Sequence, residues 1–140
     1  MNQTVRRTGY AETAQYAADA SLRGRTLAIP FEDVWQAAVR LAHGGMAGWS
    51  LTSADDYDGI IHAVCRSVFG KEHDIVIRIT LDTDAQTRVD AQAAARKPGT
   101  DFGAAARRVR RFFRALDAAL SRSSARTRSA VGAGRAERSA

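Results

Sequence analysis

Five arginines between residues 107 and 114 form the densest group of side chains in the sequence that could do chemistry. Placed on a helix at 100° per residue, Arg107, Arg111 and Arg114 lie opposite the apolar residues. An exposed guanidinium group can bind phosphate oxygens through two parallel hydrogen bonds. The candidates for an anion-binding site are therefore Arg107, Arg108, Arg111 and Arg114.

The basic charge of the chain is concentrated at its C-terminal end. Residues 1–95 carry 9 basic and 12 acidic side chains, although the whole chain of 140 residues has a formal net charge of +6. Together with the arginines of the tail, the candidate site predicts salt-dependent association with a polyanion, either nucleic acid or an anionic membrane. The alternative is a solvated helix face with Asp101 as the helix cap, since charged residues commonly cover the exposed side of a helix.

Histidine and cysteine follow no catalytic or metal-binding pattern. His43, His62 and His73 are widely spaced, and Cys65 follows His62 by three residues on a predicted strand, which places the two side chains on opposite faces. The acidic run at 55–58 lacks the later acidic ligand and the glycine of a calcium-binding loop, so we interpret it as a turn. We expect no metal, no cofactor and no catalytic residue, and the sequence indicates no reaction.

An early strand and helix begin the pattern of elements that must position these side chains. Thr26 to Ile29 predicts a short strand, and Pro30 keeps the residue before it extended. The spacing then predicts an amphipathic helix that ends at Gly44 and Gly45. Its apolar face comprises Phe31, Val34, Trp35, Ala38, Val39, Leu41 and Ala42.

Four runs that are typical of strands follow, at 48–52, 60–69, 74–81 and 87–95. In the third run, Ile75, Ile77, Ile79 and Leu81 alternate with polar residues and therefore share one face. The links between the runs are short, and Asp58-Gly59 is typical of a tight turn. Short links favour an antiparallel meander, because a parallel pair needs a crossover of about a dozen residues.

A second helix is predicted from Phe102 to about Ser121, with Thr100 or Asp101 as its cap. Its apolar arc comprises Ala105, Val109, Phe112, Phe113, Leu116 and Leu120. We therefore predict an α+β fold, a four- or five-stranded mainly antiparallel sheet covered on one face by the early and the C-terminal helix.

The ends of the chain differ from this domain in composition. Residues 1–25 are polar, and the stretch from Ala11 to Ala20 favours a short helix. We assign residues 26–121 to a single domain and predict a disordered Arg/Ser/Ala-rich tail at 122–140, because its few apolar groups offset little backbone entropy. A lone cysteine, no long apolar run and no signal-like N-terminus favour a cytoplasmic protein.

Several short motifs, in this order and spacing, resemble the uncharacterised family called domain of unknown function 1499. They are Val34-Trp35, residues 74–79, Thr87 to Asp90, residues 100–103 and Ala106 to Phe113, and the resemblance spans about Leu27 to Leu120. It implies a relationship mainly to bacterial proteins, and also to plant ones, without an established activity. The sequence departs from the family pattern at Ala93 to Ala95 and at Ala105, where the resemblance leads us to expect polar residues.

Two functional hypotheses remain open at this point. The first is a non-catalytic binding or accessory module with a small-ligand pocket between sheet and helices. The residues that would line this pocket, or else form plain core, are Trp35, Ile77, Ile79, Phe112 and Phe113. The second is a basic module that contacts nucleic acid or an anionic membrane through the last helix and the tail.

Overall fold

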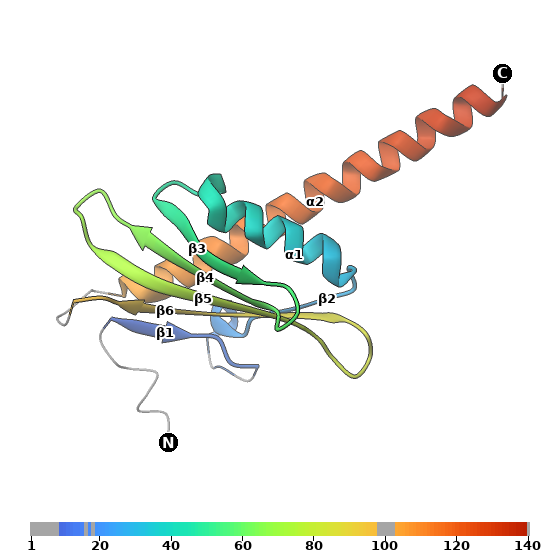
Figure 1. The fold of residues 1–140 in the computed structure, drawn as a ribbon. Helices are drawn as coiled ribbons and strands as arrows, with labels where there is room; N and C mark the ends of the chain where they lie inside the picture. Colours follow the sequence, from blue (N-terminus) through green and yellow to red (C-terminus); the bar gives the residue numbers. More distant parts are fainter. Residues whose placement is uncertain (1–8, 16, 18, 98–102, 140) are drawn as a thin grey trace.

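The structure, a computed structural model, describes residues 9–139 except 16, 18 and 98–102, without the side chains of residues 20 and 126–139. In chain order its elements are β1 (Tyr10–Glu12), the 3-10 turn η2 (Ala20–Leu22), β2 (Arg25–Leu27), α1 (Phe31–Arg40), the π-type turn η3 (Leu41–Gly45), β3 (Trp49–Asp55), β4 (Ile60–Arg66), β5 (Glu72–Leu81), β6 (Thr87–Ala95) and α2 (Ala104–Ser139). Figure 1 shows the strands as one sheet with both long helices packed beside it.

The sheet is antiparallel, and β6, β5, β4 and β3 lie side by side in that order. Two short strands share the outer edge of β6: β1 pairs with its C-terminal half and β2 with its N-terminal half. The predicted α+β class is confirmed, but the sheet has six strands where we expected four or five. The additional strand is β1, which supplies hydrogen-bonding partners to an edge that would otherwise be open.

The prediction of a short helix between Ala11 and Ala20 is wrong for the described residues. Its first residues belong to β1, and Thr13 continues the pairing, because its backbone N–H donates to the Ala91 carbonyl at 2.8 Å. The Thr13 hydroxyl also accepts the Ala91 N–H at 2.9 Å. Helix propensity in a short segment is a weak preference, and the pairing with β6 outweighs it.

One face of the sheet is apolar and buried, as the alternation predicts. On β5 the buried side chains are His73, Ile75, Ile77 and Ile79, whereas the residues between them are exposed or half-buried. Leu81, which we expected on the same face, is 59% exposed because it lies at the very end of the strand. β4 ends at Arg66, so the last residues of the run predicted at 60–69 belong to the following turn.

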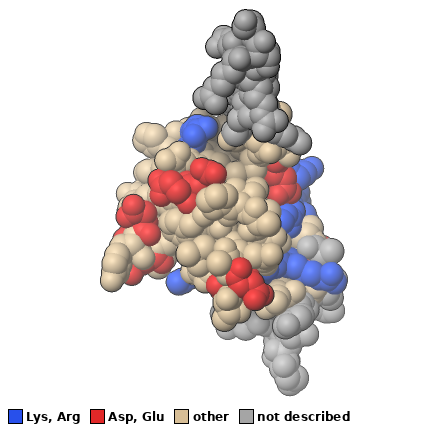
Figure 2. Space-filling view, turned by 90° about the vertical axis from the view of Figure 1, so that its right-hand side faces the viewer, with Lys and Arg blue, Asp and Glu red and all other residues tan. Residues whose placement is uncertain are grey.

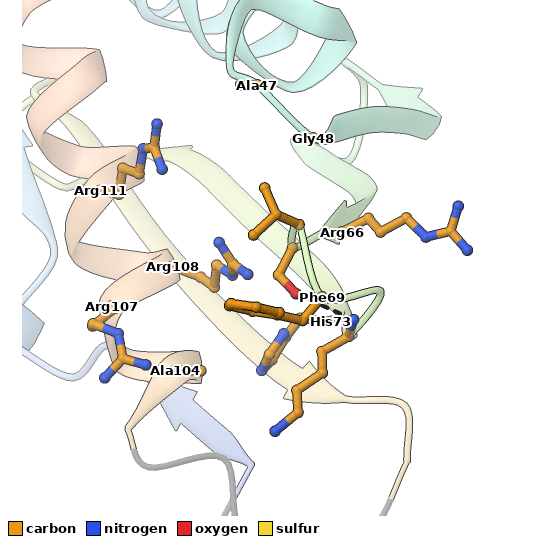
Figure 3. Close-up of a pocket in the computed structure, with 12 residues that line it drawn as sticks. Ala47, Gly48, Arg66, Phe69, His73, Ala104, Arg107, Arg108 and Arg111 are labelled. Carbon is orange, nitrogen blue, oxygen red and sulfur yellow. Dashed lines mark hydrogen bonds between the residues drawn. The ribbon is translucent and has the colours of Figure 1, made fainter.

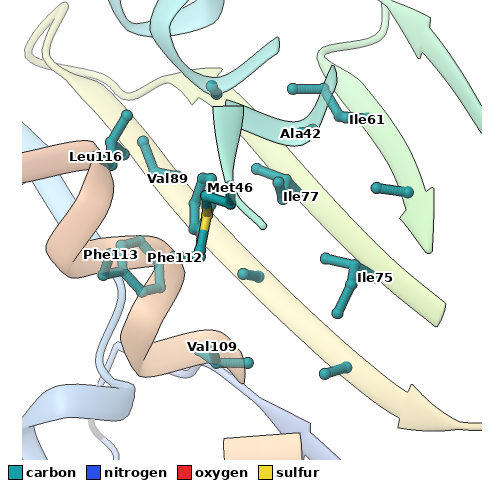
Figure 4. Packing of buried hydrophobic residues seen from close by; sticks show 14 of the residues in the cluster. Ala42, Met46, Ile61, Ile75, Ile77, Val89, Val109, Phe112, Phe113 and Leu116 are labelled. Carbon is teal, nitrogen blue, oxygen red and sulfur yellow. The ribbon is translucent and has the colours of Figure 1, made fainter. Parts of the chain in front are cut away.

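Both helices cover this single face and form one core with it. The apolar stripe of α2 packs over β6 and β1, and α1 packs over β5. Ala42 of η3 and Met46, which directly follows it, belong to the same cluster (Figure 4). The rings of Phe112 and Phe113 meet edge to face at 5.3 Å, and Trp49 stacks on Phe112 at 6.0 Å. On the opposite face of β4, β5 and β6, the side chains are exposed or half-buried.

The helix α2 begins at Ala104, and the residues predicted to cap it, Thr100 and Asp101, lie outside the described residues. Our sequence-based expectation is a tail without stable structure at 122–140. The structure continues α2 through most of this segment to Ser139, and Figure 1 shows that this part extends beyond the sheet and away from the start of the helix. In the part of the chain that the structure describes, no helix has the length and apolar character needed to cross a membrane.

Candidate functional site

A cleft of about 790 Å³ lies where β4 turns into β5, between that turn and the first turns of α2. In Figure 3, Arg107, Arg108 and Arg111 lie along α2 on one side, and Phe69 of the β4–β5 turn and His73 of β5 face them. The lining residues are Ala47, Gly48, Arg66, Ser67, Val68, Phe69, Lys71, His73, Ala104, Arg107, Arg108 and Arg111.

Positive charge dominates the lining of this cleft. None of the described residues that line it carries a carboxylate, and five are basic: Arg66, Lys71, Arg107, Arg108 and Arg111. The side chain of Arg66 points away from the α2 arginines in Figure 3, so it contributes at the rim. Like charges gathered in one cleft raise the local positive potential, which attracts anions.

Two described carboxylates close to the β4–β5 turn pair with an arginine outside the cleft. Glu72 and Asp74 of β5 instead bind Arg96 beyond the end of β6, with N–O distances of 3.4 and 2.9 Å. Within the described part of the chain, Arg66, Lys71, Arg108 and Arg111 form no ion pair with a carboxylate. The charge of these four groups is therefore available to a ligand.

Arg108 is the most constrained of these cations. Its Nε is buried, and no described residue offers this atom a hydrogen-bond acceptor. A buried N–H donor without an acceptor is costly, because it loses its bond to water and gains none in the protein. A ligand oxygen in the cleft would remove this cost, so Arg108 favours an acceptor at this position.

Register places His73 directly opposite Cys65 on the neighbouring strand, and both side chains are buried on the core face. The sequence spacing directed attention to His62 instead, which is exposed while Cys65 is buried, so the expected opposite orientation of those two is confirmed. Burial raises the pKa of the Cys65 thiol, although the charges of Arg108 and Arg111 act in the other direction. Cys65 therefore stays a protonated core residue and does not line the cleft.

The structure separates the predicted site residues into two groups. Of the four candidate arginines, Arg107, Arg108 and Arg111 line the cleft, whereas Arg114 is exposed further along α2 and does not. None of the five residues that we proposed as pocket or core lines this cleft. All are buried in the core: Trp35, Ile77, Ile79, Phe112 and Phe113.

Sequence reasoning missed the side of the cleft that the sheet supplies. Arg66, Phe69, Lys71 and His73 belong to two strands and their turn, and only the docking of α2 brings them opposite the arginines. One signal was present: Val68 and Phe69 stand beside a turn glycine and between two basic residues, an unusual place for apolar side chains.

Other local clusters indicate no site. The carboxylate of Asp55 accepts the backbone N–H groups of Tyr57 and Asp58, at 3.0 and 3.2 Å, so the acidic run at 55–58 stabilises its own turn. Among the described residues, no three His, Cys, Asp or Glu side chains gather as a metal site requires.

Comparison with protein families gives one match. A family model with the description "Protein of unknown function (DUF1499)" matches residues 7–116, which is most of the chain. Comparison with curated proteins and with solved structures gives no match. The match agrees with the resemblance that the sequence motifs indicate.

Proposed function

Because the chain belongs to the DUF1499 family, whose description assigns no activity, we propose from its own geometry that it is a binding module for an anionic ligand. The ligand occupies the cleft between the β4–β5 turn and α2. One observation carries this proposal: among the described residues, five basic side chains and no carboxylate line a single cleft.

Size and electrostatics support the same conclusion. A volume of about 790 Å³ lies in the range of small-molecule sites, which is roughly 300–1,000 Å³. The cleft lies at the N-terminal end of α2, where the helix dipole adds partial positive charge. Arginine groups on one helix can bind oxygens of one phosphate or of adjacent phosphates through paired N–H groups. We therefore propose phosphate as the preferred chemical group.

This proposal modifies both hypotheses drawn from the sequence. It keeps a non-catalytic binding module, but places the ligand at the end of the sheet instead of among Trp35 and the core phenylalanines. It keeps anion recognition by the last helix through Arg107, Arg108 and Arg111. The tail is not required, because α2 carries it away from the cleft (Figure 1).

Calorimetric titration of the full-length protein with inorganic pyrophosphate tests the proposal. We expect binding that weakens as salt rises, since ions screen exposed charges within about 10 Å at 0.1 M. Arg111→Gln and Arg108→Gln should each weaken binding by about tenfold, the effect of losing one charged hydrogen bond. Arg111 is exposed, so its replacement leaves the fold intact even if Arg108→Gln destabilises it.

Arg114→Gln is the matched control, because it removes the same charge from the same helix outside the cleft. It should bind pyrophosphate with nearly the affinity of the unchanged protein. An equal loss in Arg114→Gln and Arg111→Gln would indicate a general charge effect and contradict a site in the cleft, as would the absence of pyrophosphate binding at low salt.

A further inference from the structure

The turn between β4 and β5 displays two apolar side chains at its tip. Val68 is 94% exposed and Phe69 is 89% exposed. Backbone hydrogen bonds within the turn stabilise it. The Ser67 N–H donates to the Lys71 carbonyl at 2.9 Å, and the Gly70 N–H donates to the Ser67 carbonyl at 2.9 Å. Gly70 has a φ of +80°, which glycine adopts without strain. The turn therefore presents both apolar groups on a well-defined support.

Basic side chains surround this tip on the same end of the molecule. Arg66 and Lys71 flank it along the chain, and Arg107 and Arg111 belong to the same cleft from the α2 side. Adjacent exposed apolar residues usually mark an interaction surface, since they are unfavourable in water. Here the partner must accept apolar groups and supply negative charge over the same small area.

The turns at the opposite end of the fold are acidic. The antiparallel meander places the β3–β4 and β5–β6 turns there, and these turns carry Asp55, Asp56, Asp58, Asp82 and Asp84. Figure 2 views this end and shows several Asp and Glu groups on it, with Lys and Arg groups mainly along the right-hand side of the view. A negatively charged surface would therefore attract the β4–β5 end and repel the other, which gives the molecule one preferred orientation.

We propose that the protein docks on an anionic membrane surface through its β4–β5 end, with Val68 and Phe69 inserted among the lipid headgroups and the cations of the cleft bound to lipid phosphates. This inference rests on the proposed function, because it names a membrane as the source of the anion. The interfacial region of a bilayer accepts apolar side chains and holds phosphates at the same depth. A nucleic acid matches the charges less completely, because bases can stack on Phe69 but leave Val68 in water.

Vesicle sedimentation with the full-length protein tests the membrane partner. We expect binding to vesicles of phosphatidylcholine mixed with phosphatidylglycerol and little binding to phosphatidylcholine alone. The double variant Val68→Ser/Phe69→Ser should lose at least about tenfold in vesicle partitioning, because it removes the inserted apolar groups. Because Val68 and Phe69 also line the cleft, the pyrophosphate affinity of this variant is measured in parallel, and its loss in vesicle partitioning should be clearly larger than any loss in pyrophosphate affinity.

Tyr57→Ser is the matched control, because Tyr57 is 94% exposed on a turn at the acidic end. Its vesicle binding should equal that of the unchanged protein. A second measurement reports insertion directly: the emission of Phe69→Trp should shift to shorter wavelength when anionic vesicles are added. Trp35 and Trp49, both buried, supply the background that the unchanged protein measures.

Three outcomes overturn the membrane proposal while leaving the anion site in place. They are pyrophosphate binding without vesicle binding, vesicle binding that the double variant retains in full, and preferential binding of a mixed-sequence oligonucleotide. If the unchanged protein does not bind pyrophosphate, the anion site itself is overturned, so the failure of the membrane proposal and the failure of the proposed function are distinguishable.

Discussion

Arg110 Nη2 on α2 lies 2.6 Å from Asp19 Oδ2, in the segment that precedes β2. Arg110 Nε also donates to the Ser21 hydroxyl oxygen at 2.8 Å, and that hydroxyl donates to Asp19 Oδ1 at 2.6 Å. Three side chains thus connect the C-terminal helix to the 3-10 turn η2, about ninety residues earlier in the chain. The arginine that the sequence places beside the candidate site therefore has a structural role.

The Asp19 interaction predicts a specific pH dependence of stability. Hydrogen bonds from Ser21 and Arg110 lower the pKa of Asp19 from 3.8 to about 2. The folded state therefore favours the ionised carboxylate, so its contribution is fully present above about pH 4 and is lost as pH falls toward 2. Asp19→Asn should lower the Tm at pH 6 and have little effect at pH 2, as thermal melts across this range would measure. A Tm difference that is the same at both values would contradict it.

Phe113 should be among the residues most important for stability. It is fully buried, contacts the ring of Phe112 and lies under the guanidinium of Arg25, 4.8 Å from the ring centroid. Phe113→Ala should cost about 3–5 kcal/mol in urea unfolding, because it removes buried apolar area and leaves a cavity. Arg114→Ala, at the next position and exposed, should change the unfolding free energy by less than about 0.5 kcal/mol. Equal losses of unfolding free energy in Phe113→Ala and Arg114→Ala would show that α2 does not pack on the sheet through the face that carries Phe113.

Gly59 should not tolerate a side chain. Its φ is +70°, and a Cβ atom would lie 2.1 Å from the Ile79 carbonyl oxygen on the neighbouring strand. Gly59→Ala should therefore destabilise the protein by more than about 1 kcal/mol. Gly70→Ala is the control, since Gly70 also has a positive φ but a Cβ there meets nothing within 4 Å. The two unfolding free energies separate backbone strain from steric overlap, and we expect the larger loss for Gly59→Ala.

The part of α2 beyond Ser121 should be the least stable helical segment of the protein. Beyond Ser121 the sequence consists mainly of Ser, Arg, Ala and Gly, and isolated helices of this length are marginal in water. Amide hydrogen exchange should show protection from Ala104 to about Leu120 and nearly none after residue 126. A protein that ends at Ser121 should keep its Tm, and strong protection through residue 139 would contradict the prediction of a disordered tail.

Much of the fold follows from the sequence, because alternation and helical spacing report which side of each element is buried. Ile75, Ile77 and Ile79 on one face of a strand, and Val109, Phe112 and Leu116 on one face of a helix, are sufficient to predict a sheet covered by a helix. The strand β1, which we did not expect, could not be predicted in this way. Tyr10 to Glu12 carries no strand signal, and its conformation depends on the free edge of β6.

The candidate site divides in the same way. The sequence by itself determined that an amphipathic helix carries Arg107, Arg111 and Arg114 opposite its apolar residues, because that depends only on spacing along one element. Only the tertiary structure decided that Phe69, Lys71 and His73 face Arg107 and Arg111, that Arg114 does not join these two in the cleft, and that Glu72 and Asp74 are occupied by Arg96. These relationships depend on strand register and on how α2 crosses the sheet, which are set by packing between residues distant in the chain.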